Sequence, residues 1–227
     1  MDNSFATIFI VDGDTDVCRA LGRLLRSAGY GTRLFCSAFD FLAEHDPEPT
    51  GCILMDISMP DLDGMEVQAM LAASGCLRPI IFLTGNATIP LTVAAIRAGA
   101  VNFLAKPIDE RRLLEAVDEA LRIDAAQRSA RRLRAAIQER LGTLTARERQ
   151  VLEHVVRGRL NKQIAADLGT VEKTIKVHRA RVMRKMGARS VAELVQLAGV
   201  AGLIAEALRA HPIPNQQHRT TGMRRSH

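Results

Sequence analysis

Four short apolar runs recur through the first half of the chain, and each is followed by a polar residue of a different kind. The runs are Ile8–Val11, Ile53–Met55, Ile80–Leu83 and Phe103–Ala105, and the residues that follow them are Asp12, Asp56, Thr84 and Lys106. Continuous apolar runs of this length, separated by helical patterns, predict buried parallel strands. In open α/β sheets the ligand crevice lies outside the carboxyl ends of the strands. We therefore expect two carboxylates, a hydroxyl and an ammonium group to converge at one edge of the sheet.

This set of groups suits a divalent cation and a phosphoryl group. Asp12 and Asp56 offer the hard oxygen ligands that Mg²⁺ prefers, and the Lys106 ammonium can neutralise a phosphoryl oxygen. We expect Asp56 to be the nucleophile that takes the phosphoryl group.

The second half of the chain begins with a helix-start signal. Thr145 and Glu148 are spaced as a capping box, so we expect a helix to begin there. A second helix is expected over residues 161–168 and a third over residues 171–186, with Gly169 in the turn between them. Two helices joined by a short turn that contains glycine form the DNA-reading helix-turn-helix arrangement.

The third helix of this half presents an outward face that is cationic with small apolar gaps. Such a face suits the major groove, because ammonium and guanidinium groups meet phosphates or guanine edges while small side chains allow close approach. The candidate DNA-binding residues on this face and beside it are Lys173, Lys176, Val177, Ala180, Arg181 and Arg184.

Charge separates the two halves. Residues 1–123 contain 10 Lys and Arg against 17 Asp and Glu, a net charge of −7, and residues 124–227 contain 21 against 8, a net charge of +13. We therefore expect a site built on carboxylates in the first half and an anionic partner for the second half. With 227 residues, 47% hydrophobic and 25% charged, the composition is typical of two globular domains.

The cysteines and the first apolar stretch indicate the compartment. Cys18, Cys36, Cys52 and Cys76 share no metal-ligand spacing and are predicted to be buried or half-buried free thiols, as in cytosolic proteins. Residues 5–11 are too short to span a membrane and have no basic leader, so they predict a strand and not a signal peptide. We expect a cytoplasmic protein with no membrane partner.

Residues 7–121 closely resemble the receiver domain of two-component response regulators. The resemblance is carried by Asp12, Asp56 followed by Met59-Pro60 and Asp63-Gly64, Thr84-Gly85, Ala98-Gly99-Ala100, Phe103 and Lys106-Pro107. It implies an α/β fold with a doubly wound, five-stranded parallel sheet. It also implies an aspartyl phosphoacceptor and not a turnover enzyme, so no catalytic residue is expected.

The resemblance gives each of these residues an expected role. Asp56 is expected to accept a phosphoryl group from the phosphohistidine of a sensor histidine kinase, and Lys106 to contact that group. The Thr84 hydroxyl is expected to move towards it while the Phe103 ring turns inwards. The surface of the fourth helix, fifth strand and fifth helix then changes, which makes the domain a two-state switch.

One position departs from the family pattern. Receivers usually carry two adjacent acidic residues after the first strand, and the second is replaced here by Gly13. The resemblance places Mg²⁺ on Asp12, Asp56 and the backbone carbonyl of Ser58, so one carboxylate is missing and binding is expected to be weak. Either Asp14 or a water molecule takes the place of that carboxylate, or Asp14 or Thr15 only caps the following helix, which the helical pattern of residues 17–25 favours. If the receiver binds Mg²⁺ weakly, the alternative function is that of a DNA-binding regulator that works without phosphorylation.

The same segment also allows a remote alternative from another class. Residues 11–15 fit the Asp-x-Asp-x-Thr opening of haloacid-dehalogenase-type phosphatases, in which Asp12 would be the nucleophile and Asp14 the acid/base. That interpretation leaves Asp56 without a role, and the domain has no late acidic pair to complete the metal site.

Residues 141–205 resemble the four-helix DNA-binding domain of the LuxR/FixJ/NarL regulators. The resemblance is carried by Leu144–Arg149, Asn161–Ala165, Leu168-Gly169 and Glu172–Arg179. In that family the positions of Lys176, Val177 and Ala180 face bases, and the last helix, here from Ser190, often supplies a dimer contact. A Ser that usually caps the recognition helix is replaced by Val171, so we expect Thr170 to cap it one residue earlier.

Together these features predict a FixJ-type response regulator. We expect a receiver over residues 1–123, a basic helical linker over 124–142, an all-α four-helix helix-turn-helix domain over 143–208 and a disordered basic tail over 209–227. The implied partners are promoter DNA, a sensor histidine kinase, a second copy of the chain after activation, and RNA polymerase.

Overall fold

The computed structural model describes residues 6–47, 49–86 and 88–203, and the chain divides into two compact units, residues 1–130 and 131–227. The first unit is built on five parallel strands in the spatial order β2-β1-β3-β4-β5. They are β1 (Thr7–Val11), β2 (Gly31–Phe35), β3 (Gly51–Asp56), β4 (Ile80–Thr84) and β5 (Asn102–Ala105). The sequence prediction of a doubly wound, five-stranded parallel sheet is therefore confirmed.

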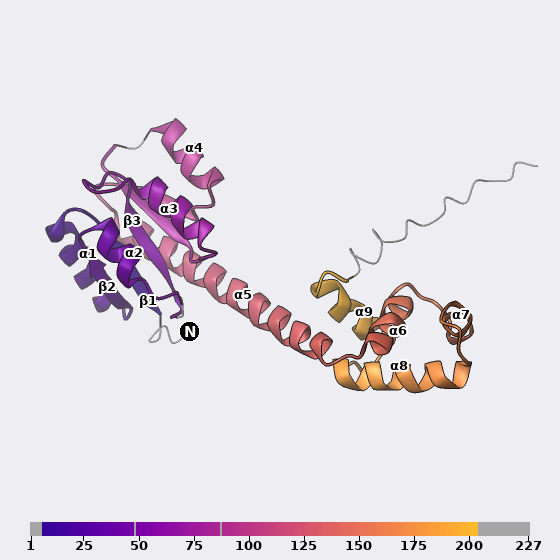
Figure 1. Ribbon diagram of the computed structural model, residues 1–227. Coiled ribbons are helices and arrows are strands. Elements are labelled where there is room, and N and C mark those ends of the chain that lie inside the picture. The colour runs from indigo at the N-terminus through magenta and orange to yellow at the C-terminus, as the bar shows by residue number, and fades with distance from the viewer. Residues whose placement is uncertain (1–5, 48, 87, 204–227) are drawn as a thin grey trace, which may run out of the picture. The chain divides into compact units, whose positions relative to one another are not determined.

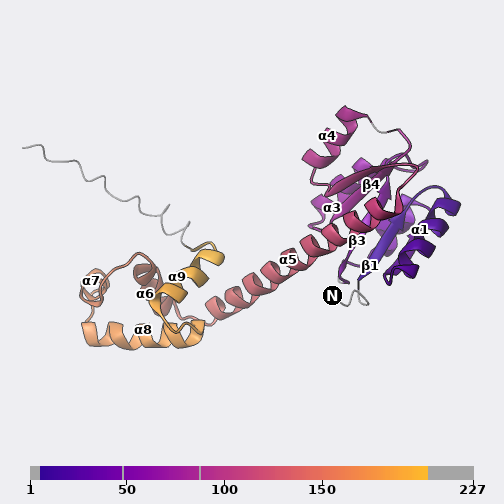
Figure 2. The ribbon, with the colours of Figure 1, turned by 180° about the vertical axis from the view of Figure 1, so that it is seen from behind.

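Five helices flank the sheet in two layers. They are α1 (Thr15–Ser27), α2 (Ala38–Glu44), α3 (Gly64–Ala73), α4 (Ile89–Arg97) and α5 (Glu110–Gly142). The helices α1 and α5 pack against one face, around Leu25, Leu113 and Val117, and this face is seen in Figure 2. The opposite face is covered by α2, α3 and α4, with α2 and α3 in front of the sheet in Figure 1. Apolar residues on both faces of β1, β3 and β4 make these strands almost wholly buried.

The start of the expected linker packs against the loop before β3. Asp124 in α5 is 3% exposed, and its Oδ2 accepts hydrogen bonds from Gly51 N at 3.0 Å and Arg128 Nε at 2.8 Å. Arg128 also donates to the carbonyl oxygens of Pro47 and Pro49. Helical structure over 124–142 is confirmed, whereas the expected domain boundaries stay predictions. The tail over 209–227 lies outside the described residues.

The second unit is helical. After the end of α5 it contains α6 (Ala146–Val156), α7 (Asn161–Asp167), α8 (Glu172–Met186) and α9 (Val191–Val200). Its core combines Ile137 and Leu141 of α5 with buried residues of all four later helices, such as Leu152, Ile164 and Val182. Gly169 has φ +61°, a conformation that glycine adopts readily and that lets the chain turn sharply between α7 and α8.

Of the two predicted helix caps, the one at α6 is confirmed and the one at α8 is wrong. Thr145 and Glu148 form both hydrogen bonds of the predicted capping box at the start of α6. The expected cap at Thr170 is wrong, because Val171 is the N-cap residue of α8 and makes no side-chain capping hydrogen bond. Packing of Ile175 and Val182 in the core sets where α8 begins, although a capping hydroxyl lies one residue earlier.

The structure also bears on thiols and membranes. All four cysteines are free, as predicted. Cys18 and Cys52 are buried and Cys76 is half-buried, but the predicted burial is wrong for Cys36, which is exposed. Within the described ranges, none of the helices combines the length and the apolar character that crossing a bilayer requires.

Candidate functional site

Three of the predicted site residues meet at the carboxyl edge of the sheet. Asp12 follows β1, Asp56 ends β3, and Lys106 follows β5. The Lys106 ammonium lies 2.6 Å from Asp12 Oδ2 and 3.3 Å from Asp56 Oδ1. Asp12 is 1% exposed and Asp56 is 7% exposed. The site is thus a buried carboxylate pair that shares one cation.

Backbone hydrogen bonds between the strands hold these side chains in place. Lys106 N donates to Thr84 O at 2.7 Å, which ties the end of β5 to the end of β4. Ile57 N donates to Leu83 O at 3.0 Å and ties the end of β3 to β4 in the same way. The chain therefore brings the three charged groups together through the sheet itself and not through mobile loops.

Burial and charge shape the ionisation of the site. Burial raises the pKa of the Asp56 carboxyl, and the charge of Asp12 raises it further, while Lys106 lowers it in part. Burial lowers the pKa of Lys106, but its hydrogen bond to Asp12 and the charges of both carboxylates outweigh burial, so the pKa is raised overall. A second cation at the site would relieve the repulsion between the two carboxylates.

The donor set fits Mg²⁺ with few protein ligands. Among the residues that the structure describes, no group of three or more His, Cys, Asp or Glu side chains gathers as in a metal-binding cluster. Asp12, Asp56 and the carbonyl of Ser58 are hard oxygen donors, and Mg²⁺ commonly keeps several waters. Asp14 Oδ1 instead accepts hydrogen bonds from Asp16 N and Val17 N, which confirms the interpretation that Asp14 caps α1.

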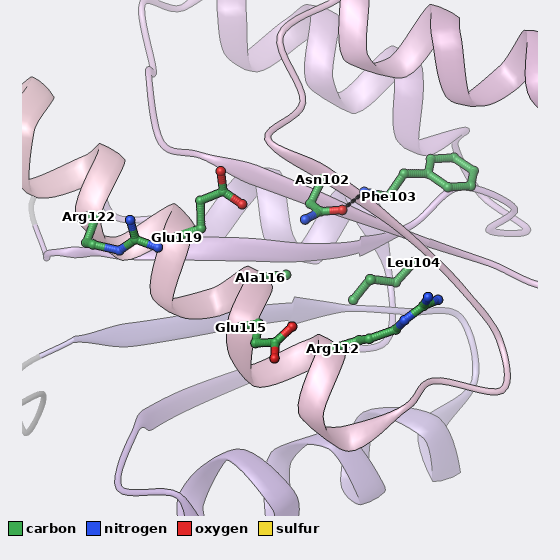
Figure 3. Close-up of a pocket in the computed structure, with 8 residues that line it drawn as sticks. All are labelled: Asn102, Phe103, Leu104, Arg112, Glu115, Ala116, Glu119 and Arg122. Atoms are coloured by element: carbon green, nitrogen blue, oxygen red, sulfur yellow. Dashed lines mark hydrogen bonds between the residues drawn. The ribbon is translucent and has the colours of Figure 1, made fainter.

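Thr84 is the last residue of β4, and Phe103 lies within β5. Thr84 is 1% exposed, and its Oγ1 accepts a hydrogen bond from Asn86 N at 3.1 Å. Phe103 is half-buried and packs against the apolar cluster beneath α2, α3 and α4, while the next residue, Leu104, packs on the α1 and α5 side. Figure 3 shows these two side chains leaving β5 in different directions, as successive residues of a strand do.

Sequence reasoning missed Asp61, which fixes the loop after Asp56. Its Oδ2 accepts hydrogen bonds from Ser37 Oγ and Ala38 N, both at 2.8 Å, and from Phe39 N at 3.3 Å. These bonds hold the loop against the start of α2 and lower the pKa of Asp61 although desolvation opposes this. An Asp in a loop of several Asp residues carries no sequence signal that would single it out.

The predicted DNA-binding face lies on α8 and is open to solvent. All six of its residues are exposed, namely Lys173, Lys176, Val177, Ala180, Arg181 and Arg184. Lys176 Nζ lies 3.3 Å from Glu172 Oε1, one turn earlier on the same helix. The opposite side of α8 is buried through Ile175, Val182 and Met186. The buried side of α8 therefore holds its cationic face in place.

An α/β unit with an acidic site at its strand ends, followed by a helix-turn-helix unit with a basic exposed helix, defines a two-domain DNA-binding regulator. Residues 8–118 match the model of the response regulator receiver domain, and residues 142–198 match that of the bacterial regulatory proteins of the luxR family. The chain therefore belongs to the two-component response regulators that join a receiver domain to a LuxR-type DNA-binding domain.

Individual relatives span almost the whole chain. Nodulation protein W of Bradyrhizobium diazoefficiens is 40% identical over 200 residues, which cover 88% of each chain. Response regulator protein TodT of Pseudomonas putida is 42% identical over 197 residues, which cover 87% of each chain. The solved structure of response regulator StyR has a TM-score of 0.77 at 43% identity and covers 86% of this chain and 98% of its own.

Proposed function

We propose that phosphoryl transfer from a sensor histidine kinase to Asp56 shifts this cytoplasmic transcription regulator to a form that dimerises and binds promoter DNA. The observation that carries the proposal is the position of Lys106, whose ammonium contacts both Asp12 Oδ2 and Asp56 Oδ1. A cation held between two carboxylates at the open edge of a sheet is placed to receive the oxygens of a phosphoryl group on Asp56.

The transfer step uses the residues of the acidic site. A carboxylate oxygen of Asp56 attacks the phosphorus of phosphohistidine, and the bond from phosphorus to the imidazole nitrogen breaks. The electron pair stays on that nitrogen, which takes a proton from solvent. Lys106 neutralises part of the charge on the transferred oxygens. Mg²⁺ bound to Asp12, Asp56 and the Ser58 carbonyl would supply further positive charge to the same oxygens.

In the proposed conformational change, the side chains of Thr84 and Phe103 move. The Thr84 hydroxyl exchanges its bond with Asn86 N for one to the phosphoryl group, and the half-buried Phe103 ring moves into the space that Thr84 leaves. Thr84 ends β4 and Phe103 lies in β5, the strand that α4 contacts, so the exchange alters the surface of α4, β5 and α5.

That surface has features suited to a second copy of the chain. On α4, Ile89 is 81%, Val93 43% and Ile96 46% exposed. A pocket between β5 and α5 is lined by charges of both signs, from Arg112, Glu115, Glu119 and Arg122 (Figure 3). Apolar side chains beside charges of both signs allow a two-fold contact, in which each charge meets its opposite on the other copy.

Two other functions remain as alternatives to the proposed phosphorylation switch. Regulation without phosphorylation is favoured by Gly13, which leaves the site with two carboxylates. The phosphatase alternative needs the Asp14 carboxyl as an acid/base, and that carboxyl caps α1. A sensor kinase, promoter DNA and RNA polymerase are the partners of the proposed function.

Phosphorylation is tested by the mass of the intact protein. After incubation with Mg²⁺ and acetyl phosphate, the wild type should gain one phosphoryl group and Asp56→Asn should gain none. Asp16→Asn is the matched control, because Asp16 is exposed on α1 and should leave the gain unchanged. No gain in a wild type that still binds DNA would instead support regulation without phosphorylation.

DNA binding is tested by its dependence on salt. Lys176→Gln should weaken binding to a mixed-sequence duplex and reduce the slope of log K against log salt by about 1, because one phosphate contact is lost. Arg23→Gln, on the exposed side of α1, removes the same charge elsewhere and should leave the slope unchanged. Equal slopes for Lys176→Gln and the wild type would exclude Lys176 from the interface.

A further inference from the structure

Two cysteines lie together beside the acidic site. Cys18 is buried in α1, and Cys36 is exposed directly after β2. Cys18 Sγ lies 3.4 Å from the carbonyl oxygen of Phe35, which is joined to Cys36 by one peptide bond. Thr15, one turn before Cys18 on α1, donates its hydroxyl to Cys36 Sγ at 3.5 Å. The two thiols are therefore neighbours between the start of α1 and the end of β2.

The alternation of side chains along β2 explains why Cys36 faces α1. Phe35 packs in the apolar cluster beneath α2, α3 and α4, whereas Leu34 packs on the α1 and α5 side. The side chain of residue 36 follows that of Leu34, because alternate residues of a strand share a face. The ionisation of Cys18 agrees, since its pKa is raised to about 12, first by burial and next by the neighbouring Cys36 thiol.

We propose that Cys18 and Cys36 form a reversible disulfide when hydrogen peroxide reaches the exposed thiol, and that this bond changes the acidic site. The Cys36 sulfur attacks one oxygen of the peroxide, the O–O bond breaks, and the other oxygen leaves as water with the thiol proton. Cys36 is then a sulfenic acid, oxidised by the two electrons that the peroxide gains. The Cys18 sulfur attacks the Cys36 sulfur, the S–O bond breaks, and water leaves with the Cys18 proton.

The bond acts on the acidic site through two contacts. Cys18 Sγ lies 3.5 Å from Asp12 O, and it leaves this oxygen when it turns towards Cys36. Ser37, which follows Cys36, donates to Asp61 Oδ2 and so holds the loop after the phosphoacceptor. Oxidation should therefore displace Asp12 and slow the gain of a phosphoryl group. This second step rests on the proposed function, because it assumes that the receiver is phosphorylated.

The disulfide is tested on the full chain by treatment with hydrogen peroxide, blocking of the remaining thiols with N-ethylmaleimide, and peptide mapping. The wild type should lose the mass of two hydrogen atoms, with Cys18 and Cys36 in the linked peptides, and dithiothreitol should reverse the change. Cys36→Ser should form no disulfide. Cys76→Ser is the matched control and should keep the bond, because Cys76 Sγ lies beside His45 Nε2, at 3.9 Å. Oxidation of Cys36 to a sulfinic acid with no linked peptide would overturn the proposal.

Receiver stability shows whether the native fold positions the two thiols. The protein has one Tyr and no Trp, and Tyr30 is buried in the receiver, so tyrosine fluorescence follows receiver unfolding alone. The bond closes a loop of about 20 residues, so peroxide should raise the receiver Tm by roughly 5 °C or more in the wild type and not in Cys36→Ser. A disulfide that leaves the Tm unchanged or lower contradicts the proposal, because the bond then forms only by distorting the fold.

The rate of phosphoryl gain tests the effect on the acidic site. With Mg²⁺ and acetyl phosphate, the oxidised wild type should gain the phosphoryl group at least about threefold more slowly than the reduced protein. Cys36→Ser should show the same rate before and after peroxide. Equal rates for the oxidised and reduced wild type would contradict this effect.

The disulfide and the proposed function can fail separately. A reduced wild type that gains no phosphoryl group but still forms the disulfide contradicts the proposed function and leaves the disulfide in place. A reduced wild type that gains the phosphoryl group but forms no bond between Cys18 and Cys36 supports the proposed function and contradicts the disulfide.

Discussion

Gly51→Ala is expected to destabilise the receiver strongly. Gly51 opens β3 and pairs with Thr7 in β1, in the middle of the sheet. A Cβ at residue 51 would lie 1.9 Å from Thr7 O, a backbone atom that no side-chain rotation can move away. Relief therefore requires the two central strands to separate, at a cost of roughly 3 kcal/mol or more.

Urea unfolding followed by Tyr30 fluorescence measures this effect in the receiver alone. The midpoint for Gly51→Ala should fall far below that of the wild type, or the protein should lack a receiver transition altogether. Gly85→Ala serves as the matched glycine, because its added Cβ would lie in open space. Similar midpoints for the two variants would show that β1 and β3 are not as closely paired as the structure has them.

Local pattern predicted four of the five strands and the meeting of Asp12, Asp56 and Lys106, whereas β2 was implied only by the resemblance to the receiver domain. An apolar run shows where a buried strand lies, and parallel strands bring the residues after them to one edge. Residues far apart in the sequence meet because the sheet aligns the ends of its strands. The DNA-binding face of α8 was predictable for the same reason, because helical periodicity separates its buried and exposed sides.

The contacts that the sequence did not predict join residues with no periodic relation. Asp61 binds the start of α2, and Asp124 in α5 binds Gly51 at the start of β3. Each is an ordinary polar residue whose partner is decided by the packed fold. The wrong cap at Thr170 has a related cause, because core packing of α8 outweighed a local capping preference.

Glu148 and Lys185 form another long-range contact of this kind. Its loss should have a large effect on the stability of the DNA-binding domain. Glu148 is 2% exposed, and its Oε2 lies 2.6 Å from Lys185 Nζ. The same oxygen accepts a hydrogen bond from Thr145 N at 2.9 Å in the capping box of α6. These hydrogen bonds, with that of Lys185 first, lower the pKa of Glu148 from 4.5 to about 2.

Glu148→Gln is therefore expected to destabilise the DNA-binding domain by about 3 kcal/mol at neutral pH. A carboxyl whose pKa is lower in the folded state stabilises the fold above its unfolded pKa, and this contribution is lost as the pH falls from about 5 to about 2. The difference between wild type and variant should thus shrink over that range. Circular dichroism melts follow the helices, while Tyr30 fluorescence should stay unchanged because the receiver is not affected.

Glu139→Gln, on an exposed site of α5, is the matched control and should leave both transitions where they are. A pH-independent difference for Glu148→Gln would mean that the variant acts through packing and not through the charge of the carboxylate. An unchanged melt at neutral pH would mean that Lys185 finds another partner of equal strength. The expected result instead places a single buried carboxylate at the junction of α6 and α8, so that the helix with the candidate DNA-binding face is held through the same residue that completes the capping box of α6.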